Sequence, residues 1–164
     1  MARIFLTHTP DMLENYYGQR ALAELRKLGD VRLNATSSVL DADALAKAAR
    51  GCEIVISDRQ TPGPAEFFAQ APDCVAFLRV AIDIRNIDVP AASKHGILVT
   101  HATAGFIASV SEMAIGYMID CGRSITRATN EYRAGQEAEP RMGRQLKGAT
   151  LGIPGMTAHG CVFV

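Results

Sequence analysis

Charged side chains follow three of the apolar runs in this 164-residue chain. They are Asp58 and Arg59 after EIVIS, Asp83 and Arg85 after CVAFLRV, and His101 after ILVT. A histidine beside a carboxylate can act as a general base, and an arginine can hold a small carboxylate. If the runs are strands of an open α/β sheet, these residues lie at strand ends, where such sheets bind ligands. The alternative is that they are loop residues joined in surface salt bridges.

Five short apolar runs alternate with helical patterns over the first 100 residues and would position these side chains. The expected strands are RIFLT, VRLNA, EIVIS, CVAFLRV and ILVT, and the expected helices cover residues 13–28, 42–50, a short segment after Pro64, and 89–95. Asp41 and Asp88 are expected to cap two of these helices. This alternation predicts an α/β fold with a parallel five-stranded sheet and helices on both faces. A response-regulator receiver shares this topology but needs clustered acidic residues after its first strand, where only Asp11 occurs.

Composition excludes several classes of function. The chain has 17 basic and 17 acidic residues, so it lacks the positive charge of a nucleic-acid binder. Its four cysteines lie far apart without metal-ligand or redox spacing, so we expect no metal and a reduced, cytoplasmic protein. The N-terminal apolar stretch is too short for a signal peptide. The apolar segment 110–121 contains Ser111, Glu112 and Asp120, and is too short and too polar to span a membrane.

A different pattern follows Thr100. One long helix is expected over about residues 108–132, with Ser109 and Glu112 forming a capping box. Its apolar stripe comprises Val110, Met113, Ala114, Tyr117, Met118, Cys121, Ile125 and Ala128. The stripe packs either against its own domain or against a second subunit, and Gly116 and Gly122 would allow close approach. A polar linker then leads to LKGATLGI, which is expected to be a sixth strand opening a second sheet.

The segments RNIDVPAASKHGILVTHATAG, SEMAIGYMI, YRAG and QLKGATLGI resemble the D-isomer-specific 2-hydroxyacid dehydrogenases, the family of phosphoglycerate, glycerate and formate dehydrogenases. The resemblance implies a flavodoxin-like substrate domain over residues 1–100 and a dimerisation arm over 101–148. Residues 149–164 would be the remnant start of a dinucleotide-binding domain, an aborted Rossmann first strand. The family implies NAD or NADP as cofactor and a homodimer through the helix 108–132.

The resemblance also points to substrate-binding positions. Family members carry a glycine-rich stretch before an Asp-Asn pair, where backbone N–H groups meet the substrate carboxylate, and VAIDIRN matches it here. The residues implied as substrate-binding are Arg79, Ala81, Ile82, Asp83, Arg85 and His101, and the catalytic candidates are His101 and Asp83. Ala81 and Asp83 replace usual glycines, and Arg85 replaces the usual Asp. A carboxylate at Asp83 would repel an anionic 2-oxo acid unless Arg85 or Arg79 neutralised it.

The end of the sequence resembles a dinucleotide fingerprint that has lost one glycine. Gly155 and Gly160 keep the first and third positions, but Thr157 occupies the second, where backbone must approach the pyrophosphate. Pro154 stands where a central strand needs an N–H donor. The family's catalytic Arg and His–Glu pair lie beyond residue 164. We therefore expect no cofactor for this chain, which would be a truncated or degenerate homologue inactive in hydride transfer by itself. The tail from Pro154 is either native or the product of a truncation or a shifted reading frame.

Two further readings stay open. The chain could be a cofactor-independent enzyme that reuses the substrate cleft, or a binding module for a small carboxylate built from the substrate domain. Neither reading involves nucleic acid or a membrane as partner.

Overall fold

The computed structural model describes residues 1–152 and divides the chain into two compact units, Met1–Thr103 and Ala104–Val164. The fingerprint residues Pro154, Gly155, Thr157 and Gly160 lie outside the described residues. Among the residues described, no helix combines the length and the apolar character needed to cross a lipid bilayer.

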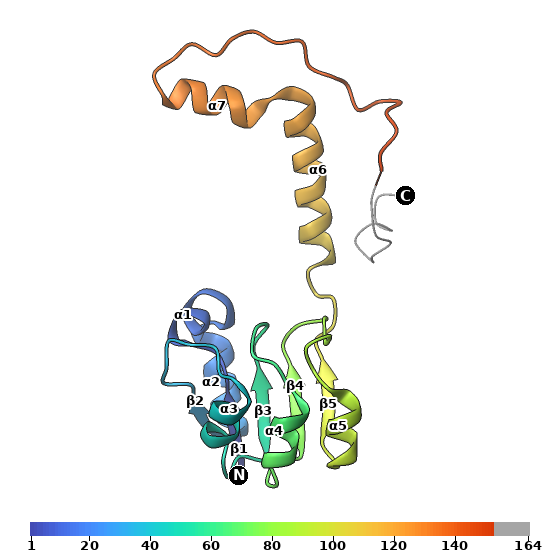
Figure 1. Ribbon diagram of the computed structural model, residues 1–164. Helices are drawn as coiled ribbons and strands as arrows, with labels where there is room; N and C mark the ends of the chain where they lie inside the picture. Colours follow the sequence, from blue (N-terminus) through green and yellow to red (C-terminus); the bar gives the residue numbers. More distant parts are fainter. Residues whose placement is uncertain (153–164) are drawn as a thin grey trace. The chain divides into compact units, whose positions relative to one another are not determined.

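The first unit is built on a parallel sheet with strand order β2-β1-β3-β4-β5 (Figure 1). The strands are β1 (Ala2–Leu6), β2 (Gly29–Leu33), β3 (Ile54–Ser57), β4 (Ala76–Arg79) and β5 (Leu98–His101). Every pair of neighbouring strands runs parallel. The predicted five-stranded parallel sheet is therefore confirmed, and the candidate loops all leave its carboxyl edge.

Helices cover both faces, as the alternation of apolar runs predicted. Side chains along β1 and β3 point alternately to opposite faces, because a strand repeats every two residues. Phe5 and Val55 pack against α3 (Ala42–Ala48), α4 (Ala65–Gln70) and α5 (Val89–Lys94), and Ile4 and Ile56 pack on the other side. The predicted caps are confirmed, since the side chain of Asp41 accepts from the N–H of Ala44 and that of Asp88 from the N–H of Ala91.

The second face is covered by an interrupted helical segment. The expected helix over 13–28 is divided into the π-helical turn η1 (Leu13–Tyr17) and α2 (Gln19–Leu28), and a short helix α1 (Pro10–Met12) precedes them. Gly18 separates η1 from α2 with a φ of 81°, which an L side chain rarely adopts. The single-helix prediction was therefore wrong, because Gly18 supplies a conformation that helices do not contain.

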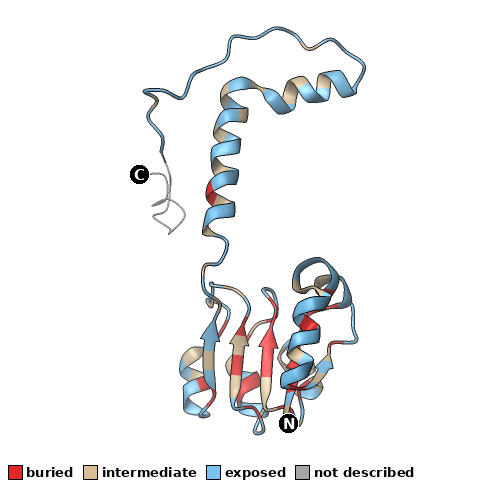
Figure 2. Cartoon of the chain, turned by 180° about the vertical axis from the view of Figure 1, so that it is seen from behind, coloured by how far each residue is buried: buried red, intermediate tan, exposed pale blue. Residues whose placement is uncertain are grey.

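On the face of the sheet that carries α2, the helices cover β1 but do not extend as far as β5. Ile4, Ile54, Ala76 and Leu98 lie in register across β1, β3, β4 and β5. Ile4 is buried at the covered end of this row, whereas Leu98 at the other end is 61% exposed. Figure 2 views this side and shows the exposed strand β5. Within the described residues, β5 also has no neighbour on its outer edge.

The second unit contains two helices where the sequence predicted one. They are α6 (Ile107–Arg123) and α7 (Ile125–Arg133), and Ser124 between them has a left-handed φ of 55°. The Asp120 carboxylate accepts hydrogen bonds from the N–H and the hydroxyl of Thr126, both at 2.6 Å. This side chain therefore bonds the first turn of α7 just after α6 ends. Figure 1 shows the break between the two helices, which the continuous apolar stripe in the sequence did not indicate.

Two other expectations for this unit were wrong. The helix α6 begins at Ile107, so Ser109 lies inside its first turn and is not the capping residue, a position that Phe106 occupies. Residues 146–152 form no strand and contain a turn at Lys147 and Gly148. A strand needs a neighbouring strand to bond its backbone N–H and C=O groups. The described part of this unit contains no other strand that could pair with residues 146–152.

The segment after α7 returns to the end of α6. The N–H of Arg144 donates to the carbonyl of Gly122 at 2.8 Å. A Cβ on Gly122 would lie 3.2 Å from the carbonyl oxygen of Arg144. The small size of Gly122 therefore allows residue 144 of the same chain to approach α6 closely.

Candidate functional site

The carboxyl edge of the sheet collects the polar residues that the sequence singled out. Strands β4 and β5 are neighbours, and Arg79 is in register with His101 at their ends. Asp58 follows β3 on the other side of β4. A parallel sheet brings its strand ends to one edge, so residues more than twenty positions apart in the sequence meet there.

Residues 80–85, here called the β4 loop, connect β4 to the segment before α5. The N–H of Val80 donates to the carbonyl of Ser57 at 3.1 Å, and the N–H of Ala102 donates to the carbonyl of Ala81 at 3.2 Å. The loop is thus fixed to the ends of both neighbouring strands. Within the described residues, the backbone N–H groups of Ala81 and Ile82 make no hydrogen bond. These two donors remain available to an anionic group.

Asp83 and Arg85 in the β4 loop form a forked ion pair. The Nε of Arg85 lies 2.9 and 3.0 Å from the two carboxylate oxygens of Asp83, and one terminal nitrogen lies 2.7 Å from the second. Hydrogen bonds from Arg85 hold the pKa of the Asp83 carboxyl well below its usual range. The side chains are 91% exposed for Arg85 and 50% for Asp83. Arg85 therefore balances the charge at Asp83, and the pair lies in solvent beside the two available N–H groups.

Arg79 has a different environment, although the sequence grouped it with Arg85. It is only 5% exposed, and burial lowers the pKa of its guanidinium. Its acceptors are the hydroxyl of Ser57 (3.2 Å) and the backbone carbonyls of Thr61 (3.1 Å), Asp83 (3.2 Å), Asp58 and Arg59. Arg79 thus contacts the main chain of Asp83 and not its carboxylate.

Asp58 is also buried and fully engaged. Its carboxylate accepts from the hydroxyls of Thr7 (2.5 Å) and Thr61, and from the N–H groups of Gln60 (2.6 Å) and Thr61 (3.1 Å). Burial raises the pKa of this carboxyl, but the hydrogen bonds from Thr61 and Thr7 outweigh burial and leave it below the ordinary value. Asp58 therefore stays charged, and its hydrogen bonds to Gln60 and Thr61 stabilise the turn of the loop after β3.

His101 is not assembled into an acid–base pair in the described structure. It is exposed, and its Nδ1 lies 2.9 Å from the carbonyl oxygen of Ala102. Within residues 1–152, its ring forms no hydrogen bond or ion pair with a carboxylate. The edge therefore has the groups to bind an anion, and the histidine and carboxylate needed for proton transfer are not brought together.

From the sequence alone, no role was expected for Thr7, Thr61 or His8. His8 follows β1 and is 3% exposed, its ring centroid lies 4.9 Å from that of Tyr17, and its Nδ1 has no partner among the described residues. The available signal was the polar stretch Thr7-His8-Thr9 directly after a buried strand, at the same edge as Asp58.

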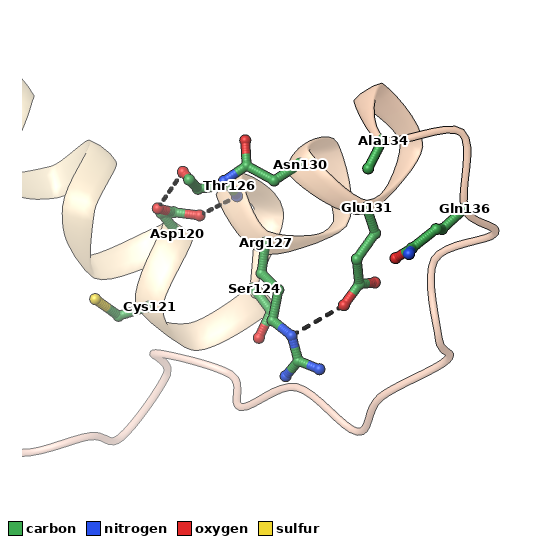
Figure 3. Close-up of a pocket in the computed structure, with 9 residues that line it drawn as sticks. All are labelled: Asp120, Cys121, Ser124, Thr126, Arg127, Asn130, Glu131, Ala134 and Gln136. Carbon is green, nitrogen blue, oxygen red and sulfur yellow. Dashed lines mark hydrogen bonds and ion pairs between the residues drawn. The ribbon is translucent and has the colours of Figure 1, made fainter.

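A hollow of about 540 Å³ lies in the other unit, where α6 meets α7 (Figure 3). Its lining includes Asp120, Arg127 and Glu131. Asp120 is turned to Thr126, and Arg127 bonds Glu131 at 3.1 Å, so these charges are satisfied internally. The described residues contain no group of His, Cys, Asp or Glu side chains that could hold a metal ion.

Residues 146–152 do not form the strand that would open a dinucleotide-binding unit. The expected binding unit is a strand, a glycine turn and a helix, and residues 146–152 leading into the fingerprint are not a strand. No chemical step can therefore be assigned to a nicotinamide on these residues.

Comparisons with known proteins agree on one family. A family model described as D-isomer specific 2-hydroxyacid dehydrogenase, catalytic domain, matches residues 5–154. Hydroxypyruvate reductase of Thermotoga maritima is 32% identical over 124 residues, which cover 75% of this chain and 40% of that protein. (S)-sulfolactate dehydrogenase of Chromohalobacter salexigens is 30% identical over 145 residues, covering 88% and 47%. The chain thus spans less than half the length of these relatives.

Solved structures share the fold. D-2-hydroxyisocaproate dehydrogenase matches with a TM-score of 0.74 and 22% identity, covering 99% of this chain and 48% of that one. The apo structure of D-lactate dehydrogenase from Escherichia coli matches with a TM-score of 0.68 and 22% identity, covering 88% and 44%. At these identities the likeness is one of architecture.

Proposed function

This chain belongs to the D-isomer specific 2-hydroxyacid dehydrogenase family, and we propose that its first unit binds the carboxylate of a small 2-oxo or 2-hydroxy acid at the β4 loop. The relatives that it matches are named as reductases and dehydrogenases of such acids. In a complete protein of this family, the unit would present the substrate to NAD or NADP held by another domain.

The observation that supports this proposal is the β4 loop itself. Its available donors are the N–H groups of Ala81 and Ile82, and the exposed guanidinium of Arg85 lies in the same loop. Backbone N–H groups and arginine are the donors that recognise carboxylates. Because Asp83 already occupies one side of Arg85, the net attraction for an anion is small and binding is expected to be weak.

The 164 residues by themselves are proposed to carry out no hydride transfer. Thr157 and Pro154 disrupt the dinucleotide fingerprint, and His101 and Asp83 form no proton-transfer pair. NADH oxidation with glyoxylate or hydroxypyruvate, followed by absorbance, tests this directly. A turnover rate that co-purifies with the chain would overturn this part of the proposal.

Calorimetry with a panel of 2-oxo and 2-hydroxy acids tests the binding site. Asp83→Ala should tighten binding by about two- to fivefold, the size of an exposed ion-pair effect, because it frees Arg85 for the ligand. Arg85→Ala should abolish measurable binding, because it leaves Asp83 unbalanced. Arg50→Ala, which removes the same charge from the turn before β3 at the opposite edge of the sheet, should change nothing.

A weaker affinity after Asp83→Ala would contradict this site. Asp83 would then be a ligand or a catalytic group, and the alternative of a cofactor-independent enzyme using the same edge would replace the proposal.

Two further properties belong to the proposal. The chain is proposed to form a homodimer through α6 and α7, because their apolar side chains Met113, Tyr117 and Ile125 are exposed. A cytoplasmic location is proposed because Cys52, Cys74 and Cys121 are free thiols.

A further inference from the structure

The guanidinium of Arg79 connects two loops at the carboxyl edge of the sheet. On one side it donates to the carbonyls of Asp58, Arg59 and Thr61, all in the loop between β3 and α4. On the other side its Nε donates to the carbonyl of Asp83 in the β4 loop at 3.2 Å. One buried side chain therefore holds the main chain of both loops.

The loop between β3 and α4 is itself fixed to the sheet. The Thr7 hydroxyl at the end of β1 donates to the Asp58 carboxylate and accepts from the Asp58 N–H at 2.8 Å. Hydrogen bonds thus run from β1 through Asp58 and Arg79 to the β4 loop. The loop with the available N–H groups is anchored across three strands.

The loop between β3 and α4 also contacts the segment 86–88, which follows the β4 loop. The N–H of Gly63 donates to the carbonyl of Asn86 at 3.0 Å, and the N–H of Asp88 donates to the carbonyl of Gly63 at 2.7 Å. These bonds form a short parallel bridge between Gly63 and Ile87. Arg79 holds the β4 loop at Asp83, and this bridge holds the segment 86–88 that follows the loop and leads into α5.

We propose that Arg79 is a positioning residue, which acts through the Asp83 carbonyl to fix the β4 loop in the shape that presents the Ala81 and Ile82 N–H groups to a carboxylate. This inference rests on the proposed function for the identity of the ligand. Arg79 itself is buried, and its donors are directed to protein oxygens, so it is the support of the binding loop and not a ligand.

The test compares Arg79→Lys with Arg50→Lys in the 164-residue chain. Lysine keeps the positive charge at position 79 but lacks the planar fork that reaches several carbonyls at once. Arg50 is exposed in the turn before β3 at the opposite edge of the sheet, and its guanidinium donates no hydrogen bond within residues 1–152, so it is the matched control. Amide hydrogen exchange by NMR measures the loops, and calorimetry with glyoxylate and hydroxypyruvate measures binding.

In Arg79→Lys, we expect the amides of Gly63, Val80 and Asp88 to exchange about tenfold faster or more, while those of Phe5 and Val55 keep their rates. The dissociation constant for the 2-oxo acid should rise by about tenfold, the equivalent of about 1.4 kcal/mol. Arg50→Lys should leave both measurements unchanged. Loop exchange that stays at the wild-type rate would overturn the inference, and if binding is then lost, Arg79 contacts the ligand directly.

The experiment remains informative if the wild-type chain does not bind the acid or if the variant does not fold. If the wild-type chain binds no carboxylate, the proposed function fails, and the exchange rates alone still decide whether Arg79 holds the loop. If Arg79→Lys does not fold, Ser57→Ala removes one acceptor of the guanidinium without a change of charge. It should accelerate exchange of the same three amides to a smaller extent, and unchanged rates would reject the positioning role.

Discussion

At the carboxyl edge of the sheet, two buried polar side chains satisfy their hydrogen-bonding groups to different degrees. Asp58 accepts hydrogen bonds from Thr7, Gln60 and Thr61, so its charge is stabilised in place. His8 faces the charge of Asp58 and the ring of Tyr17, yet its Nδ1 has no partner in the described structure. Burial lowers the pKa of His8, and the neighbouring Asp58 opposes that shift without cancelling it. His8 is therefore neutral in the folded protein at pH 7.

Lowering the pH from 7.5 to 5 should destabilise the protein in part through His8. The folded-state pKa lies below the unfolded value of 6.5, so the unfolded chain binds the extra proton and stability is lost as the pH falls through 6.5. The slope from one such group is at most about 1.4 kcal/mol per pH unit. Denaturant titrations should show a shallower pH dependence for His8→Phe than for the wild-type protein. Equal slopes in the two proteins would contradict this assignment.

At the scale of elements, regular local patterns were predicted well and interruptions were not. The five strands and the caps at Asp41 and Asp88 follow from apolar runs and short polar side chains, which act locally. The break at Ser124 depends on the Asp120 side chain reaching Thr126 across the helix end, a contact that an apolar stripe does not report. The edge that holds the candidate site was predicted from topology alone. The sequence did not predict that Arg79 is buried and supports the loop while Arg85 is exposed. Whether an arginine at a strand end is buried depends on how the neighbouring loop folds over it.

The bridge between the loops around Gly63 and Ile87 makes a further element-scale prediction. A Cβ at Gly63 would lie 3.1–3.2 Å from Phe68, Ile87 and Phe77, which are all buried. Gly63→Ala should therefore destabilise the first unit by about 1–3 kcal/mol through overpacking. Gly105→Ala is the matched control, since an added Cβ there meets nothing within 4 Å. Urea unfolding measures both variants, and a neutral Gly63→Ala would mean that the two loops separate easily.

At the scale of the whole molecule, the dimer proposal concerns the apolar surface of the second unit. Tyr117 on α6 is 62% exposed, and Met113 and Ile119 on the same helix are exposed as well. Tyr117→Glu should weaken the dimer at least tenfold, because a charge buried without a partner costs about 1.4 kcal/mol or more. Tyr16→Glu, at an 85% exposed tyrosine of the first unit, should leave it intact. Sedimentation velocity at micromolar concentration decides, and a monomeric wild-type chain would reject the proposal.

The strand order has a consequence for how the protein folds as it leaves the ribosome. β1 emerges before β2 and β3 but lies between them in the sheet, so it cannot complete its hydrogen bonding until residues 54–57 have followed. During that interval the apolar side chains of Ile4 and Leu6 lack the strand beside which they will be buried. The pairing of β1 with β3 closes the longest loop between neighbouring strands, and long closures slow folding. Nascent chains that stop before β3 should therefore be the ones that chaperones retain, while those that include β3 can close the centre of the sheet.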